Sequence, residues 1–164
     1  MKNIYLIGMP GCGKSTIGKS VSSSLDIKFI DLDEYIVSFT GRTIADMFEE
    51  GEGVFRKAET DSLKQVSKME NLVVATGGGV IVTPENIEIM QKSGKVIFID
   101  CDVETILKNS TLDGRPLLKD KTRIYDLYNN RIELYKKAAM HTVDNNGAFD
   151  DVLKNTIEII KAEM

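Results

Sequence analysis

Short apolar runs alternate with stretches of helical periodicity along the whole chain. The runs that predict β-strands are 3–7, 27–31, 71–76, 95–100 and 141–146. The stretches that predict helices are 14–25, 43–51, 54–69, 84–94, 103–109, 123–140 and 149–164, with one more helix that begins at 35. Repeated β–α units of this kind predict an α/β fold, in which helices cover both faces of a parallel sheet.

One segment interrupts this alternation. Residues 110–122 combine glycine, proline and several charges, which predicts a loop long enough to be functional or mobile. No repeat, linker or low-complexity stretch divides the remainder of the chain. A length of 164 residues fits one domain with a substantial core.

Composition narrows the range of partners and compartments. The formal net charge of −4 argues against nucleic acid as the main partner, because such a partner usually requires a basic surface. No apolar stretch reaches the roughly 18 residues of a membrane span, so we expect no membrane. Two cysteines are too few for a disulfide framework or a zinc site, and they indicate a reducing, cytoplasmic setting.

The most specific motif is GMPGCGKS at residues 8–15, which matches G-x-x-x-x-G-K-[ST] between a predicted strand and a predicted helix. Glycines let backbone N–H groups turn inward, and the following helix N-terminus completes an anion site. Lys14 is expected at the terminal phosphates of a nucleotide and Ser15 at Mg²⁺. The predicted nucleotide contacts are Gly11, Cys12, Gly13, Lys14, Ser15 and Thr16. The loop alone leaves open whether the phosphate passes to water or to an acceptor.

Two carboxylates follow the second predicted strand. Ligands of open α/β sheets bind beyond the carboxyl ends of the strands, so Asp31 and Asp33 are expected near the phosphate loop. One would meet Mg²⁺ through water and the other an acceptor hydroxyl; the alternative is that Asp33 only caps the next helix. Asp100 ends another apolar strand, but we rank Asp31 above it for the metal shell.

Three glycines, Gly77, Gly78 and Gly79, follow the third predicted strand. Such a run allows a ligand to lie against bare backbone. A flexible turn is the alternative, but a turn does not require three glycines in a row.

Three arginines occupy positions where a charge requires a reason. Arg56 has Glu59 at i+3 on a predicted helix, so it either makes a solvated ion pair or points into a cleft. Arg131 shares an apolar helix face and requires a partner, either a structural carboxylate or a substrate carboxylate. Arg115 lies in the 110–122 loop, either as a solvated residue or as a cation that closes over the transferring phosphoryl group.

The sequence resembles the shikimate kinases along nearly its whole length. The segments that carry the resemblance are, in order, GMPGCGKST, FIDLDEYI, IADMFEEGEGVFRKAE, ATGGGVI, GRPLL and RIELY. The resemblance implies a single P-loop kinase domain over 1–164 of the nucleoside-monophosphate-kinase type. This is a three-layer α/β/α fold with a five-stranded parallel sheet, a helical substrate-binding segment at about 33–60 and a mobile lid at about 110–122.

The same resemblance implies ATP and Mg²⁺ as cosubstrate and metal, and phosphorylation of the 3-hydroxyl of shikimate on the way to chorismate. Asp33 would bind the shikimate hydroxyls and orient the attacking one or accept its proton. Arg56 and Arg131 would hold the shikimate carboxylate, and Gly78, within the 77–79 run, would contact the ring. We expect a monomer.

The resemblance assigns the phosphate contacts as well. Arg115 would be the lid arginine on the ATP phosphates, and Asp31 would meet Mg²⁺ through water. Lys14, Asp33 and Arg115 then form the expected catalytic set.

This chain departs from the family where the adenine is bound. The family commonly places an arginine on adenine in the helix before the lid, where this chain has Asn109 beside Lys108. Asn145 or Asn146, after the fifth strand, is a further candidate for contact with adenine. A related kinase, such as a gluconate kinase, and a P-loop regulator that binds nucleotide without transferring phosphate are the alternative functions.

Overall fold

A computed structural model of the chain describes residues 1–113 and 121–164. The described residues form a five-stranded sheet in the order β2 (Lys28–Asp31), β3 (Leu72–Ala75), β1 (Asn3–Ile7), β4 (Gly94–Asp100) and β5 (His141–Asp144). Every neighbouring pair of strands is parallel. The predicted α/β class and five-stranded parallel sheet are therefore confirmed.

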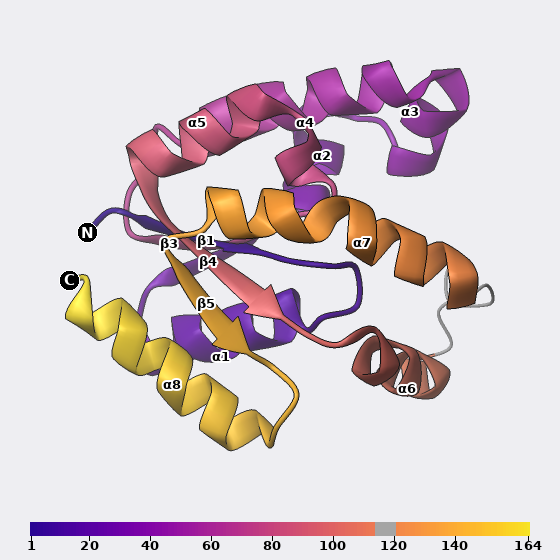
Figure 1. The fold of residues 1–164 in the computed structure, drawn as a ribbon. Coiled ribbons are helices and arrows are strands. Elements are labelled where there is room, and N and C mark those ends of the chain that lie inside the picture. Colours follow the sequence, from indigo (N-terminus) through magenta and orange to yellow (C-terminus); the bar gives the residue numbers. More distant parts are fainter. Residues whose placement is uncertain (114–120) are drawn as a thin grey trace.

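Helices lie on both faces of this sheet (Figure 1). On one face lie α1 (Lys14–Leu25) and α8 (Phe149–Ala162), which pack against each other. On the other lie α5 (Pro84–Ser93) and α7 (Lys121–Ala138), both of which contact β4. This arrangement produces the predicted three layers, with the carboxyl ends of all strands at one edge.

Three consecutive helices connect β2 to β3. They are α2 (Leu32–Thr40), α3 (Ile44–Glu50) and α4 (Glu52–Val66), and α4 packs on the other two and on α5. The strongly bent connections require glycine: Gly41 ends α2 with φ 70° and Gly51 precedes α4 with φ 156°. Residues of α3 and α7, which Figure 1 shows as separate helices on the same side of the sheet, line one opening near the carboxyl edge.

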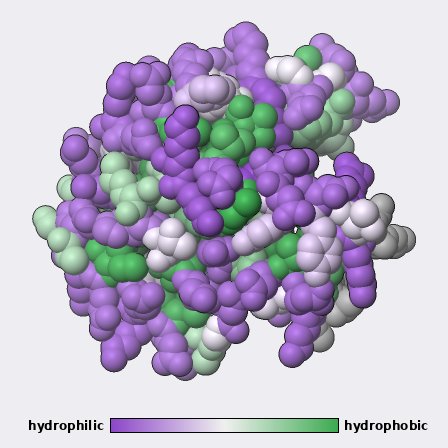
Figure 2. All heavy atoms as spheres, viewed as in Figure 1, coloured by the Kyte–Doolittle hydropathy of each residue, from purple (hydrophilic) through white to green (hydrophobic). Residues whose placement is uncertain are grey.

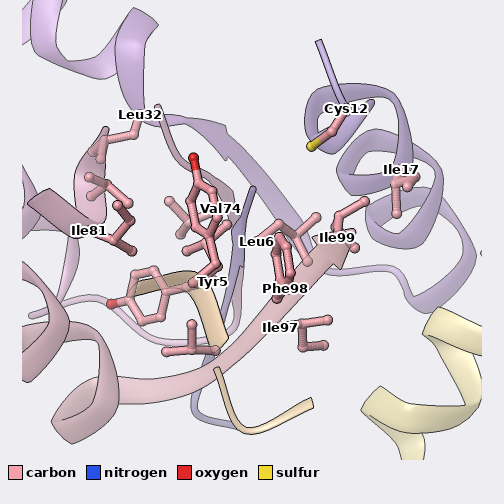
Figure 3. Close-up of a cluster of buried hydrophobic side chains, with 14 of the residues drawn as sticks. Tyr5, Leu6, Cys12, Ile17, Leu32, Val74, Ile81, Ile97, Phe98 and Ile99 are labelled. Atoms are coloured by element: carbon pink, nitrogen blue, oxygen red, sulfur yellow. The ribbon is translucent and has the colours of Figure 1, made fainter. Parts of the chain in front are cut away.

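The buried core consists of apolar side chains on the two faces of the central strands (Figure 3). Leu6 and Ile97 pair in register, and Leu6 approaches α1 at the position of Gly18. On the opposite face the ring of Phe98 stacks on Tyr135 of α7, with ring centroids 5.0 Å apart. This stacking fixes α7 over the sheet, so it positions the residues of α7 that face the opening.

The last two elements are α6 (Val103–Asp113) and the short 3₁₀ helix η1 (Val80–Val82). The predicted loop at 110–122 is too long at both ends, because α6 continues to Asp113 and α7 begins at Lys121. The surface in Figure 2 is mainly hydrophilic with small hydrophobic patches. In the part of the chain that the structure describes, no helix is both long and apolar enough to cross a membrane.

Candidate active site

The phosphate loop, residues 8–15, connects the central strand β1 to α1. Gly11 and Gly13 adopt left-handed conformations, with φ of 78° and 91°, which glycine adopts readily. Lys14 is only 7% exposed, and its Nζ donates to the carbonyls of Gly8 at 2.7 Å and Met9 at 2.9 Å. The lysine therefore lies folded over the loop, with its charge at the concave side.

Asp31 connects this loop to the start of α2. Its Oδ2 accepts from the Ser15 hydroxyl at 3.0 Å. Its Oδ1 caps α2 by accepting from the backbone N–H groups of Asp33 at 3.0 Å and Glu34 at 3.3 Å. The alternative that Asp33 caps this helix is wrong, since Asp31 is the cap. Ser15 and Asp31 together offer the hard oxygen ligands that Mg²⁺ prefers.

The Asp33 side chain lines two cavities beside the loop. Its Oδ1 lies 3.1 Å from the position that a Cβ on Gly77 would take. Burial raises the pKa of Asp33, and the charge of Asp31 adds to the rise, while Lys14 and Arg56 oppose it. The carboxylate is thus kept in a partly dehydrated position where its charge is costly unless a ligand or cation compensates for it.

The first cavity has a volume of about 600 Å³ and lies between α3, α4 and α7. It also opens onto the phosphate loop. Its lining includes Pro10, Gly11, Asp33, Ile44, Phe48, Phe55, Arg56, Glu59, Gly77, Gly78, Gly79, Arg123, Leu127 and Arg131. Apolar walls with a few convergent charges are typical of a site for a small polar molecule.

Arg56 points into this cavity. Its Nη1 donates to Glu59 Oε1 at 3.0 Å and to the carbonyl of Gly79 at 3.1 Å, and its Nε lies 3.4 Å from Glu52 Oε1. The alternative of a solvated surface pair with Glu59 is wrong, because the Glu59 side chain is 0% exposed and that of Arg56 is 16% exposed. The guanidinium is held from two elements, α4 and the glycine run.

Glu59 is the buried carboxylate that sequence reasoning underestimated. Burial raises its pKa, and the positive charges of Arg56 and Arg131 lower it in part. Its second oxygen, Oε2, is buried without a hydrogen-bond partner among the described atoms, and it lies 3.5 Å from the position of a Cβ on Gly77. The i+3 spacing from Arg56 pointed to this residue, but its burial depends on where the glycine run lies.

Arg131 reaches the same cavity from α7. It acts electrostatically on Glu59 and on Tyr135, which lies one helical turn further along. Tyr135 is fully buried, and its hydroxyl donates to the carbonyl of Gly78 at 2.5 Å. Burial raises the pKa of Tyr135, so it stays a neutral donor. The apolar helix face that Arg131 shares includes Tyr135, but the sequence pattern does not show that Tyr135 holds the glycine run.

Each glycine of the 77–79 run faces a different side chain. A Cβ on Gly77 would approach Asp33, a Cβ on Gly78 would lie 2.6 Å from Pro10 Cδ, and a Cβ on Gly79 would lie 2.6 Å from Arg56 Nη1. The backbone is bare here because the space is filled by protein atoms. All three glycines also line the first cavity.

A second cavity of about 530 Å³ lies on the other side of the phosphate loop. Its lining includes Gly11, Cys12, Gly13, Thr16, Thr105, Lys108, Asn109, Asn145, Asn146 and Phe149. A third cavity of about 280 Å³ lies between the first two, at Gly13, Lys14, Ser15, Thr16, Asp31 and Asp33. Gly11 of the phosphate loop lines all three cavities, so they lie next to one another around this loop.

Two other candidate residues, Asp100 and Arg115, are not part of these cavities as the structure describes them. Asp100 accepts from Tyr128 at 3.4 Å, and burial raises its pKa. It is not among the residues that line the three cavities, and its lower rank for the metal shell stays a prediction. Arg115 lies outside the described residues, so its predicted place on the phosphates stays a prediction.

Comparisons with known proteins agree with this arrangement. The family model described as shikimate kinase matches residues 10–161. A shikimate kinase of Clostridium botulinum is 48% identical over 162 residues, which are 98% of each chain. The structure of a shikimate kinase from Acinetobacter baumannii in complex with shikimate is similar, with a TM-score of 0.89 and 36% identity over 99% of this chain and 94% of that one. The shikimate kinase of Bacteroides thetaiotaomicron gives a TM-score of 0.90 at 28% identity, over 98% of both chains.

Proposed function

The chain belongs to the shikimate kinase family, which makes it an ATP-dependent kinase, and we propose that the three cavities hold the parts of its two substrates. The ATP base occupies the second cavity, its phosphates the third, and shikimate the first. The γ-phosphoryl group passes to the 3-hydroxyl of shikimate, a step toward chorismate and the aromatic amino acids. The observation that carries this assignment is that Asp33, Arg56 and Arg131 line one cavity that opens onto the phosphate loop.

The charges of the first cavity support a carboxylated cyclic alcohol as acceptor. Arg56 and Arg131 come from different helices, and a carboxylate between them would accept from both guanidinium groups. Asp33 lies at the border with the third cavity, where it orients the attacking hydroxyl toward the γ-phosphate or accepts its proton. Gly77, Gly78 and Gly79 line the same cavity, so the ring would lie beside this run.

The phosphate side relies on positioning and on neutralisation of charge. Lys14 exchanges its two carbonyl contacts for the β- and γ-phosphates, which would lie against the backbone of Gly11, Gly13, Ser15 and Thr16 in the third cavity. Cys12 lines the second cavity and donates its own N–H to the Met9 carbonyl at 3.2 Å. Mg²⁺ fits beside Ser15 directly and beside Asp31 through water, where it would neutralise phosphate charge. Arg115 of the predicted lid completes this set.

The setting we propose is a monomer in the cytoplasm. Residues of one chain line all three cavities, so no second copy is required to build the site. Cys12 and Cys101 are both buried free thiols, which suits a reducing compartment. Burial raises the pKa of Cys101 to about 12, so this thiol stays protonated.

A coupled assay of ADP release tests the proposal directly. The enzyme is incubated with ATP and Mg²⁺, and shikimate or gluconate is supplied as acceptor. Release that requires shikimate is the expected result, and Arg131→Ala should raise the KM for shikimate while the KM for ATP stays nearly constant. If ADP were released with gluconate alone, gluconate would replace shikimate as the assigned acceptor. If no ADP were released although ATP binds, the proposal of phosphoryl transfer would be overturned.

A further inference from the structure

One contact connects the end of the sheet to the middle of the phosphate loop. Asn145 follows β5, and its Nδ2 donates to the backbone carbonyl of Cys12 at 2.7 Å, across 133 residues of sequence. The same side chain lies close to the next residue of the loop, since a Cβ on Gly13 would lie 3.1 Å from Nδ2. The amide therefore packs on the peptide that joins Cys12 to Gly13.

The residue that makes this contact is itself held firmly. The Asn145 backbone N–H donates to the carbonyl of Asp100 at 2.7 Å, and its carbonyl accepts from the Cys101 thiol at 3.5 Å. Both partners belong to the end of β4 or to the residue after it, next to the centre of the sheet. The amide therefore extends from a rigid support to the loop.

Peptide geometry gives this contact its consequence. A peptide unit is planar and trans, so its C=O and N–H groups point in opposite directions. With the Cys12 carbonyl turned toward Asn145, which lines only the second cavity, the N–H of Gly13 is turned away from Asn145. Gly13 also lines the third cavity, where the phosphates are proposed to lie. Gly13 tolerates this orientation because its φ is 91°.

We propose that Asn145 is a positioning residue for phosphoryl transfer: its amide fixes the Cys12–Gly13 peptide so that the Gly13 N–H faces the ATP phosphates. The proposal rests on the nucleotide site proposed above. It assigns Asn145 an effect on the phosphates even though the residue lines the second cavity, where the base lies. A residue that only contacts the base would affect the binding of ATP but not the binding of a phosphate chain that carries no base.

Inorganic tripolyphosphate with Mg²⁺ separates these roles, because it carries the phosphate chain without a base. Binding of tripolyphosphate and of ATP would be measured by calorimetry for the wild type, Asn145→Ala, Asn145→Leu and Lys14→Met. Leucine has the same number and branching of side-chain heavy atoms as asparagine but no hydrogen-bonding group, so it serves where alanine does not fold. Asn146→Ala is the matched control, since the Asn146 amide bonds to the Asp102 N–H and the Asp144 carboxylate.

Both Asn145 variants should bind tripolyphosphate about three- to tenfold more weakly than the wild type, which is the effect of one hydrogen bond. Their affinity for ATP should fall by a similar factor. The KM for shikimate should not change, and Asn146→Ala should bind tripolyphosphate like the wild type. If either Asn145 variant bound ATP more weakly but bound tripolyphosphate like the wild type, the proposal would be overturned. If Lys14→Met also bound tripolyphosphate like the wild type, the phosphate site itself would be wrongly assigned.

Discussion

A single methyl group at Gly79 should separate acceptor binding from catalysis. Gly79 has φ −98° and ψ 10°, so alanine suits its backbone. The added Cβ would lie 2.6 Å from Arg56 Nη1 and 2.8 Å from Cζ, with Nη2 closer still. Since ordinary contacts begin at 3.4 Å, the guanidinium must move by about 1 Å, a displacement that suffices to impair a site of fixed geometry.

The magnitude follows from the contacts that this displacement breaks. Arg56 loses its hydrogen bond to the Gly79 carbonyl and its proposed alignment with the acceptor carboxylate. A hydrogen bond to a charged group contributes about 1.5–3 kcal/mol, so the KM for shikimate should rise roughly ten- to a hundredfold. Because Glu59 is buried behind Arg56, the free energy of unfolding should fall by about 1–3 kcal/mol, which most domains tolerate.

The assay is coupled ADP release at varied shikimate and saturating ATP, together with urea unfolding. Gly53→Ala is the control, because Gly53 lies in α4 near Arg56 but a Cβ there meets nothing within 4 Å. It should leave both KM values unchanged and stabilise the helix by at most about 1 kcal/mol. An unchanged KM for shikimate in Gly79→Ala would refute the role of Arg56 in holding the acceptor.

Four further predictions concern three single side chains. Asp33→Asn should reduce kcat at least about a hundredfold with little change in ATP affinity, and equal losses in both would contradict the role. Burial raises the pKa of Asp33 above 3.8, so the folded chain binds this proton more tightly than the unfolded chain and ionisation of Asp33 costs stability. Asp33→Asn should therefore raise the free energy of unfolding at pH 7. This gain should disappear as the pH falls toward 3.8, which urea titrations at several pH values would measure. Tyr135→Phe should destabilise the fold by about 1–3 kcal/mol, because it leaves the Gly78 carbonyl without its donor; a smaller loss in thermal unfolding would argue against this contact. Lys14→Met should abolish nucleotide binding that calorimetry detects in the wild type, and retained ATP affinity would exclude Lys14 from the phosphate site.

The local parts of this molecule were predictable from sequence. The phosphate loop was recognised because its signature and its flanking strand and helix are contiguous, and the helix predicted at 14–25 coincides with α1. The predicted start of α2 at 35 was late, because Leu32 and the first turn lie under the Asp31 cap. A cap depends on one side-chain rotamer, which periodicity does not report.

The parts that depend on distant contacts were not predictable in the same way. Whether Glu59 is solvated depends on the path of the glycine run, which lies in a different β–α unit. The contact between Asn145 and Cys12 depends on β5 lying beside β4. Sequence spacing gives the face of a helix but not the element that this face will meet.

The glycine run after β3 explains how α2, the phosphate loop, α4 and α7 are held in fixed positions relative to one another. Gly77 lies against Asp33 of α2, Gly78 against Pro10 of the phosphate loop, and Gly79 against Arg56 of α4. From the other side, Tyr135 of α7 holds the Gly78 carbonyl. Protein packing on one short backbone segment therefore sets the distance between the third cavity, proposed for the phosphates, and the first cavity, proposed for the acceptor. For a reaction that relies on in-line positioning, a methyl group on any of the three glycines would therefore displace a different part of the site: Asp33, the phosphate loop or Arg56.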